Sequence, residues 1–119
     1  MWVKMSWVRI PPNPCDNIKS IYKELKDNIL LIGADVKIKP KAKYMAFIRK
    51  TNFVDIVLYR NQINLFLNMR KGALNDPKDF ARDVSSVGHW GNGDYQVVLS
   101  DLNDIGYLTS LVRQSYDKN

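Results

Sequence analysis

The sequence predicts an α+β fold, a two-layer sandwich in which an antiparallel sheet of about four to five strands carries an N-terminal and a C-terminal helix on one face. Three observations predict this class. Apolar residues recur at helical spacing near both ends of the chain. Between these stretches, apolar and polar residues alternate as in half-buried strands. The turns near residues 51–52 and 60–61 are too short for anything but antiparallel pairing.

A chain of 119 residues has the length of one domain. We assign residues 15–119 to that domain and residues 1–14 to an extended arm, because Pro11, Pro12 and Pro14 prevent a helix or a central strand there. Apolar residues alternate along the arm as in a strand. We expect it to dock on its own sheet or on that of a second copy, and a homodimer formed partly through the arms is the preferred version.

The first helix is predicted over residues 16–32. Asp16 or Asn17 can cap its start, because a short side-chain oxygen accepts the free N–H groups of the first turn. Gly33 occupies the place of a left-handed C-terminal cap. The apolar stripe of this helix comprises Ile18, Ile21, Tyr22, Leu25, Ile29 and Ile32.

Short strands follow, at residues 35–39, 44–50, 53–59, 62–69 and 95–100. Their alternation predicts that the side chains facing the helices are buried, among them Val54, Ile56, Leu58, Leu65 and Leu67.

A long connection separates the last two of these strands. It is expected to hold a short helical turn over residues 77–83, because Asp76 followed by Pro77 suits a helix start. An ordered loop follows over residues 84–94. The closing helix is predicted over residues 101–116, with Ser100 or Asp101 as its cap.

Several functional classes are excluded by composition. No apolar run approaches the roughly 18 residues of a membrane span, so we expect no membrane partner. One cysteine, Cys15, fits a reducing cytoplasm. A single histidine and a single cysteine give no zinc signature, and no glycine-rich nucleotide loop of the common kinds is present. We therefore predict no metal and no cofactor.

Positive charge is concentrated in the first half of the chain. The net charge is +6, and residues 1–60 hold 12 basic and 5 acidic residues. Residues 36–54 contain six basic residues and no acidic one, which are the candidate nucleic-acid contacts: Lys37, Lys39, Lys41, Lys43, Arg49 and Lys50. If residues 37–43 stay extended, the four lysines project from one side. They contact phosphates, protect a sheet edge from aggregation, or do both.

Four aromatic residues interleave with this basic stretch: Tyr44, Phe47, Phe53 and Tyr59. Such side chains can stack on bases. In a small sheet such side chains more often fill the core or cover the sheet.

The loop over residues 88–94 is the second candidate site. Its glycines allow close backbone approach to a ligand, with Trp90 as a stacking surface, or simply form a sharp turn into the next strand. His89 can be imagined in a hydrolase with neighbouring serine and aspartate residues, or as an internal brace of the loop. The ligand-binding candidates are His89, Trp90, Asn92, Asp94 and Arg82, and no catalytic residue is assigned.

A family resemblance appears in the second half of the chain. NFVDIVLYRNQINLFLNM (residues 52–69), KGALNDPKDFARDVSSVGHWGNGDYQVVL (residues 71–99) and the closing RQSYD resemble an uncharacterised bacterial family labelled "predicted transport protein". The resemblance covers roughly residues 17–116. It implies a domain of unknown function that stands alone or at the C-terminus of restriction- or nuclease-like chains, and it supplies no catalytic residues.

The function that we expect is therefore that of a small, non-catalytic binding or accessory domain. Nucleic acid is the first partner to consider, because the chain is basic and because the resemblance implies attachment to restriction- or nuclease-like chains. A small-molecule or peptide-binding module that uses residues 88–94 is the alternative, and a hydrolase that uses His89 is a third.

Overall fold

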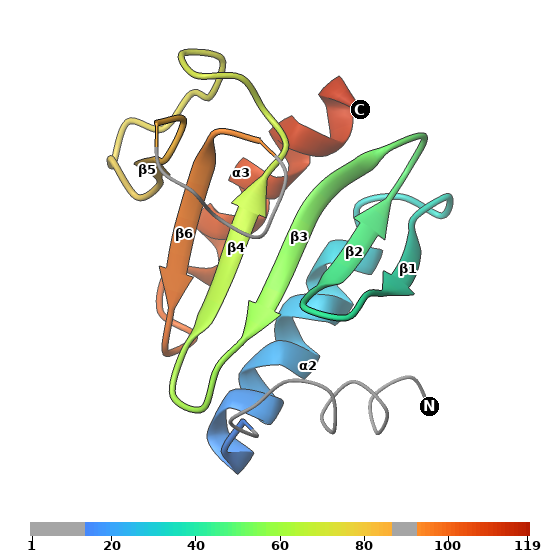
Figure 1. Ribbon diagram of the computed structural model, residues 1–119, viewed down its shortest axis with the longest axis vertical. Coiled ribbons are helices and arrows are strands. Elements are labelled where there is room, and N and C mark those ends of the chain that lie inside the picture. Colours follow the sequence, from blue (N-terminus) through green and yellow to red (C-terminus); the bar gives the residue numbers. More distant parts are fainter. Residues whose placement is uncertain (1–13, 87–92) are drawn as a thin grey trace.

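An antiparallel sheet forms one layer of the protein and two helices form the other (Figure 1). The computed structural model describes residues 14–86 and 93–119. In these residues the elements are, in chain order, α2 (Asp16–Leu30), β1 (Lys37–Pro40), β2 (Met45–Ile48), β3 (Asn52–Leu58), β4 (Ile63–Leu67), β5 (Arg82–Asp83), β6 (Tyr95–Leu99) and α3 (Ile105–Lys118). The strand order across the sheet is β1-β2-β3-β4-β6-β5.

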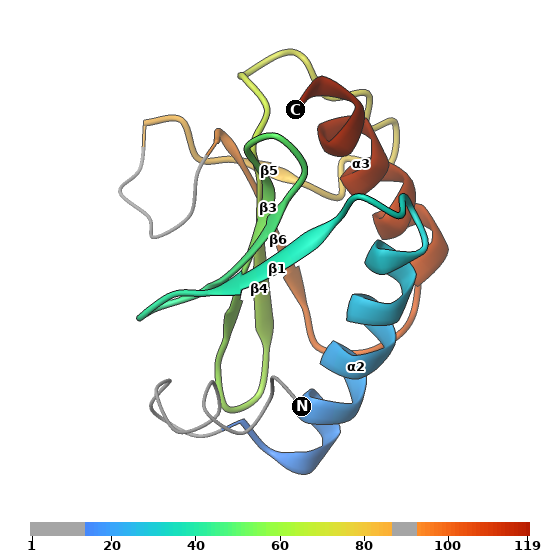
Figure 2. The ribbon, with the colours of Figure 1, turned by 90° about the vertical axis from the view of Figure 1, so that its right-hand side faces the viewer.

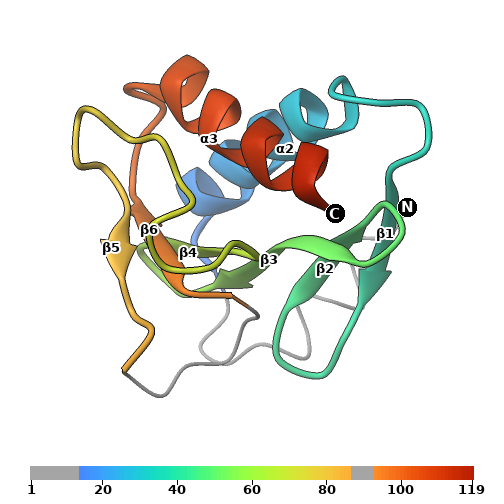
Figure 3. The ribbon, with the colours of Figure 1, turned by 90° about the horizontal axis from the view of Figure 1, so that it is seen from above.

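Both helices cover the same face of the sheet, as predicted (Figures 2 and 3). The five strand residues expected in the core, Val54, Ile56, Leu58, Leu65 and Leu67, are all fully buried. The register explains why they share a face: Ile56 lies opposite Leu65, and Val54 lies opposite Leu67. The apolar stripes of α2 and α3 complete this core.

The opposite face of the sheet carries a second, smaller apolar cluster. Val57, Phe66 and Val84 are buried there, and Tyr44 and Tyr59 pack against them. Val57 and Phe66 alternate with the core residues of β3 and β4, so they point away from the helices. The sheet is therefore apolar over part of both faces.

The described part of the sheet has six strands, one more than the upper expectation. The additional strand is β5, in a segment that we predicted to be a short helical turn over residues 77–83. That prediction is wrong. The chain turns at Pro77–Lys78, Asp79 takes a left-handed conformation with φ of 52°, and Arg82 and Asp83 then pair with β6. Pairing with a distant strand overrides the local helix signal.

All three expected helix caps are also wrong. Cys15 is the N-cap of α2, without a side-chain capping bond. The C-cap of α2 is Leu31 in right-handed geometry, instead of a left-handed Gly33. The N-cap of α3 is Asp104, with φ of 61° and no side-chain capping bond. Asp101 instead accepts a hydrogen bond from the backbone N–H of Asn103 (2.9 Å), within the loop that precedes the helix. Neither helix therefore begins with the side-chain capping bond that the sequence predicts.

Gly33 has a tertiary reason to be glycine. A Cβ atom at this position would lie 2.2 Å from Tyr116 Oη and 2.8 Å from Asp35 Oδ1.

Two further predictions concern the N-terminal arm and the membrane. The expected arm lies, except for Pro14, outside the described residues. Within residues 14–86 and 93–119, no helix is both long enough and apolar enough to cross a membrane.

Candidate functional site

The basic stretch folds into the β1–β2 hairpin at one edge of the sheet (Figure 1). The backbone N–H of Lys41 donates to the carbonyl of Tyr44 (2.8 Å) and closes the turn. Residues 37–43 therefore do not stay extended, and the four lysines do not form a single row. Lys37 and Lys39 lie on β1, whereas Lys41 and Lys43 lie in the turn, because the chain reverses after Pro40.

The lysines of this hairpin are exposed to solvent. Ile38, between Lys37 and Lys39, packs against the core beneath the helices, so the two lysines point to the opposite face of the sheet. Lys41, Lys43 and Lys50 are exposed as well. The hairpin thus presents cationic side chains along the outer edge strand and at both of its ends.

Arg49 differs from the lysines, because its guanidinium already contacts Asp35 and Tyr116 of the same chain. Its Nε lies 3.3 Å from Asp35 Oδ2, and its Nη1 donates to the carbonyl of Tyr116 (3.2 Å). The guanidinium also lies 4.4 Å from the centre of the Tyr116 ring. Arg49 therefore joins the β2–β3 turn to α3 and is less available to a phosphate than the lysines.

The contacts with Tyr116 and Arg49 change the pKa of the Asp35 carboxyl. The hydrogen bond from Tyr116 lowers the pKa of Asp35 below its ordinary value, and the charge of Arg49 adds to the effect. The same hydrogen bond raises the pKa of Tyr116.

The four aromatic residues of the basic stretch fall into two groups. Phe47 and Phe53 are fully buried in the core beneath the helices, where no base can reach them. Tyr44 and Tyr59 are half-buried on the other face, beside the second apolar cluster.

The second candidate site is described only in part. His89, Trp90 and Asn92 lie outside the described residues, so their predicted roles stay predictions. Asp94 accepts a hydrogen bond from the backbone N–H of Lys71 (2.8 Å) and Arg82 is exposed on β5. The Asp94 backbone binds Met69 and Val84 on either side. Asp94 therefore fastens the start of β6 to the segment that follows β4.

Asp83, which precedes this loop on β5, has two partners among the described residues. Its carboxylate accepts a hydrogen bond from the backbone N–H of Ser85 (2.9 Å) and lies 3.6 Å from Lys71 Nζ. The hydrogen bond to Ser85 is the main cause of its lowered pKa.

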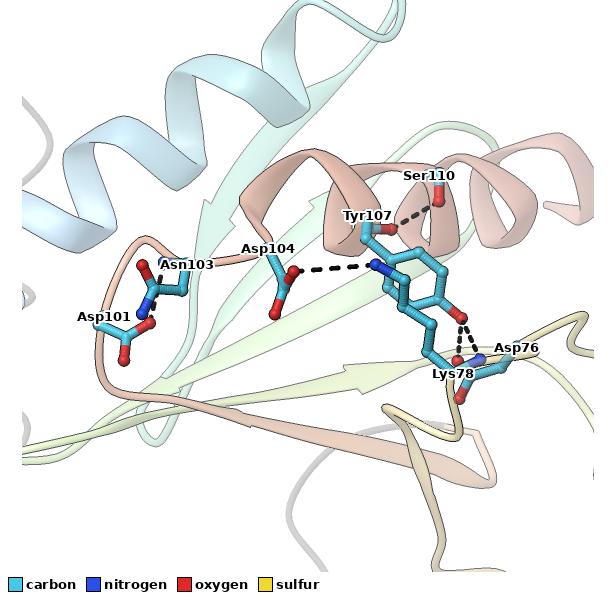
Figure 4. A network of polar contacts seen from close by, with 7 residues as sticks. All are labelled: Asp76, Lys78, Asp101, Asn103, Asp104, Tyr107 and Ser110. Carbon is cyan, nitrogen blue, oxygen red and sulfur yellow. Dashed lines mark hydrogen bonds and ion pairs between the residues drawn. The ribbon is translucent and has the colours of Figure 1, made fainter.

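A polar network that the sequence did not reveal docks the β4–β5 connection on α3 (Figure 4). Tyr107 Oη donates to Asp76 Oδ1, and the backbone N–H of Ala81 donates to Asp76 Oδ2 (2.7 Å). Lys78 Nζ lies 3.9 Å from Asp104 and 4.9 Å from the centre of the Tyr107 ring. Both oxygens of Asp76 are thus engaged, which is typical of a structural carboxylate.

The pKa of Asp76 reflects two opposing causes. Desolvation raises this pKa, but the hydrogen bonds from Tyr107, Ala81 and Phe80 outweigh it, and the pKa is lowered.

Residues 14–86 and 93–119 contain no cluster of three or more histidine, cysteine, aspartate or glutamate side chains that could hold a metal ion.

The fold and the hairpin define a small two-layer α+β domain with a cationic sheet edge. The chain belongs to the family described as "Domain of unknown function (DUF5655)", which matches residues 12–119. A Haemophilus influenzae protein described as "Uncharacterized protein" is 35% identical over 100 residues, which are 84% of this chain and 33% of that protein. The chain therefore spans about a third of the length of the curated relative that it matches. No solved structure matches the chain.

Proposed function

We propose that this protein is a small, non-catalytic binding domain and that the β1–β2 hairpin is its contact with nucleic acid. The observation that carries the proposal is the concentration of exposed lysines on this hairpin, where residues 36–54 include no acidic residue. Such a field attracts a polyanion and neutralises its phosphates.

The contacts of the hairpin refine the predicted set of residues. Lys37, Lys39, Lys41 and Lys50 form no ion pair with any residue in the described parts of the chain, so their charges are available to a partner. Arg49 is engaged with Asp35 and Tyr116. We therefore assign the phosphate contacts mainly to these four lysines and to Lys43.

Edge protection by the same lysines is compatible with this function. β1 is an outer strand, and lysine on such a strand opposes pairing between sheets of different molecules. The two roles differ in one measurable property. Nucleic-acid binding predicts an affinity for nucleic acid that falls as the salt concentration rises, whereas edge protection predicts no such affinity.

The experiment is fluorescence anisotropy with labelled single-stranded and duplex oligonucleotides at about 50 mM and about 200 mM salt. We expect the triple variant Lys37→Gln, Lys39→Gln and Lys41→Gln to bind more weakly. For duplex DNA, the slope of log affinity against log salt should fall by about 0.9 for each phosphate that the variant no longer neutralises.

A matched control carries the same change of net charge elsewhere, through Lys23→Gln, Lys71→Gln and Arg113→Gln. These residues are exposed and lie outside the hairpin. The control should keep most of the affinity and the original slope. Absence of binding at low salt, or equal weakening in both triple variants, contradicts the proposal.

The remaining expectations about partners, location and assembly stay predictions of this proposal. Attachment to a restriction- or nuclease-like chain, the transport label, a cytoplasmic location and an arm-mediated homodimer are all predictions. A small-molecule or peptide module and a hydrolase at residues 88–94 are the competing hypotheses, and their central residues His89 and Trp90 lie outside the described chain.

A further inference from the structure

A cavity of about 370 Å³ lies at the end of the sheet where β4 ends and the last turn of α3 arrives, close to the C-terminus marked in Figure 1. It is lined by Asn68, Met69, Arg70, Ala73, Lys118 and Asn119. Cavities of this size accommodate small organic molecules. The hairpin lysines Lys37, Lys39 and Lys41 do not line it, so it is separate from the proposed nucleic-acid contact.

The wall of the cavity is held in place by carboxamide side chains. Asn119 Nδ2 donates to the carbonyl of Asn68 (2.9 Å), and Thr51 Oγ1 donates to Asn119 Oδ1 (3.0 Å). Asn68 Nδ2 donates to the carbonyl of Asn52 (2.7 Å). These bonds join α3, the β2–β3 turn and the end of β4. A site preorganised in this way loses little conformational freedom when a ligand binds.

The ionisable side chains of the lining are both cations, Arg70 and Lys118, and its other side chains are carboxamides or apolar. The α-carboxylate of Asn119 is the one negative group among the lining residues. Neither cation forms an ion pair within residues 14–86 and 93–119. By contrast, Arg49 pairs with Asp35, and Lys71 pairs with Asp83. Two cationic side chains against one α-carboxylate leave the lining with a net positive charge, which favours an anionic occupant.

We propose that this cavity binds a small organic anion whose phosphate or carboxylate group contacts Arg70 and Lys118. Arginine presents a planar fork that binds either group through two parallel hydrogen bonds, and lysine adds a second point charge. Met69 and Ala73 offer apolar contacts to the body of the molecule. This proposal does not depend on nucleic-acid binding by the hairpin.

The test follows the full chain by NMR, using the backbone and side-chain amide signals of Asn68 and Asn119. The probes are adenosine monophosphate as the organic phosphate and citrate as the carboxylate, with inorganic phosphate as a third probe. We expect one of the two organic anions to shift these signals in a saturable manner. The double variant Arg70→Gln and Lys118→Gln should weaken that binding about tenfold or more, because neither glutamine can form a charge-assisted hydrogen bond to the anion.

Three controls separate the possible results. The double variant Lys23→Gln and Arg113→Gln removes the same charge elsewhere and should leave the dissociation constant unchanged. The hairpin triple variant should also leave it unchanged, so this proposal and the previous one fail independently. Absence of saturable shifts with every probe up to about 10 mM, shifts at other residues, or equal weakening in the control double variant overturns the proposal.

Discussion

The Tyr116 hydroxyl donates a hydrogen bond of 2.6 Å to Asp35 Oδ1, from a residue 81 positions away in the sequence. Arg49 lies over the Tyr116 ring and binds the other oxygen of the same carboxylate. Phe53 meets the ring edge-on at 5.4 Å. This arrangement joins α3, the segment after α2 and the β2–β3 turn, and therefore ties the basic hairpin to the helical layer.

The first prediction concerns the pH dependence of the hydrogen bond between Tyr116 and Asp35. The pKa of Asp35 is lowered in the folded protein from its ordinary value of 3.8, first by this hydrogen bond. A carboxyl of this kind stabilises the fold above the unfolded pKa, and the contribution disappears as the pH falls through the folded pKa. The Tm of the wild type should therefore exceed that of Asp35→Asn near neutral pH.

The Tm difference should shrink as the pH is lowered from about 6 to about 2.5. Circular dichroism melts of both proteins across this range measure it, and the subtraction removes the titration of the other carboxyls. A difference that stays constant over the whole range contradicts the assignment.

The second prediction concerns Gly33. In Gly33→Ala, the new Cβ would lie 2.2 Å from Tyr116 Oη and 2.7 Å from Tyr116 Cζ. Since Arg49 and Phe53 pack against the ring, the ring cannot move aside without disturbing both, and the Tm should fall. In a Tyr116→Phe background the hydroxyl oxygen is absent, so Gly33→Ala should cost less. A thermal double-mutant cycle measures this coupling, and strict additivity would argue against it.

The third prediction compares two glycines with the same backbone conformation. Gly72 and Gly93 both have φ of 88°. A Cβ at Gly93 would lie 2.1 Å from the Leu67 carbonyl oxygen and 2.5 Å from Asn68 Cα, whereas a Cβ at Gly72 meets nothing within 4 Å. Gly72→Ala should cost only the left-handed strain, about 1–2 kcal/mol. Gly93→Ala should cost clearly more, because backbone atoms cannot give way.

Chemical denaturation of the two variants measures this difference. Equal decreases in the free energy of unfolding would show that the close approach of Gly93 to the end of β4 does not add to the cost of the substitution.

The fourth prediction concerns a buried hydroxyl. Ser115 is fully buried, and its Oγ donates to the Phe53 carbonyl (2.5 Å). That carbonyl also accepts the N–H of Asn68 (3.2 Å), so it keeps a partner in Ser115→Ala. We expect the free energy of unfolding to fall by about 1 kcal/mol and the Tm to fall by about 4 °C.

The matched control is Ser110→Ala on the exposed side of α3, where Ser110 Oγ donates to the Tyr107 carbonyl in its own helix. Its Tm should be unchanged or slightly higher, because alanine has the greater helix propensity. A larger decrease in the control than in Ser115→Ala would contradict the role of the buried bond.

The core was predictable because its signals are local. Ile18, Ile21 and Leu25 repeat at helical spacing on α2, and Ile63, Leu65 and Leu67 alternate along β4. Each pattern has one solution that buries apolar surface, and the structure adopts it for both helices and for the central strands.

The failures have different causes. Gly33 is required by the close approach of Tyr116 and not by a helix cap. Asp101 forms a local turn with Asn103 in place of a cap, and Arg82 and Asp83 pair with β6 in place of a helical turn. The candidate site follows the same division. The clustering of lysines was visible in the sequence, but the engagement of Arg49 was not. The sequence left open whether the aromatic residues stack on bases or fill the core, and the structure buries Phe47 and Phe53.

The sequence by itself determined the α+β class, the antiparallel pairing of neighbouring strands and the identity of the core residues, because hydrophobic periodicity and short turns act over a few residues. Only the tertiary structure decided that β6 lies between β4 and β5 and that Asn68 meets Asn119 beside a cavity. These relationships join residues far apart in the chain. They arise from the simultaneous packing of all elements, which no local pattern encodes.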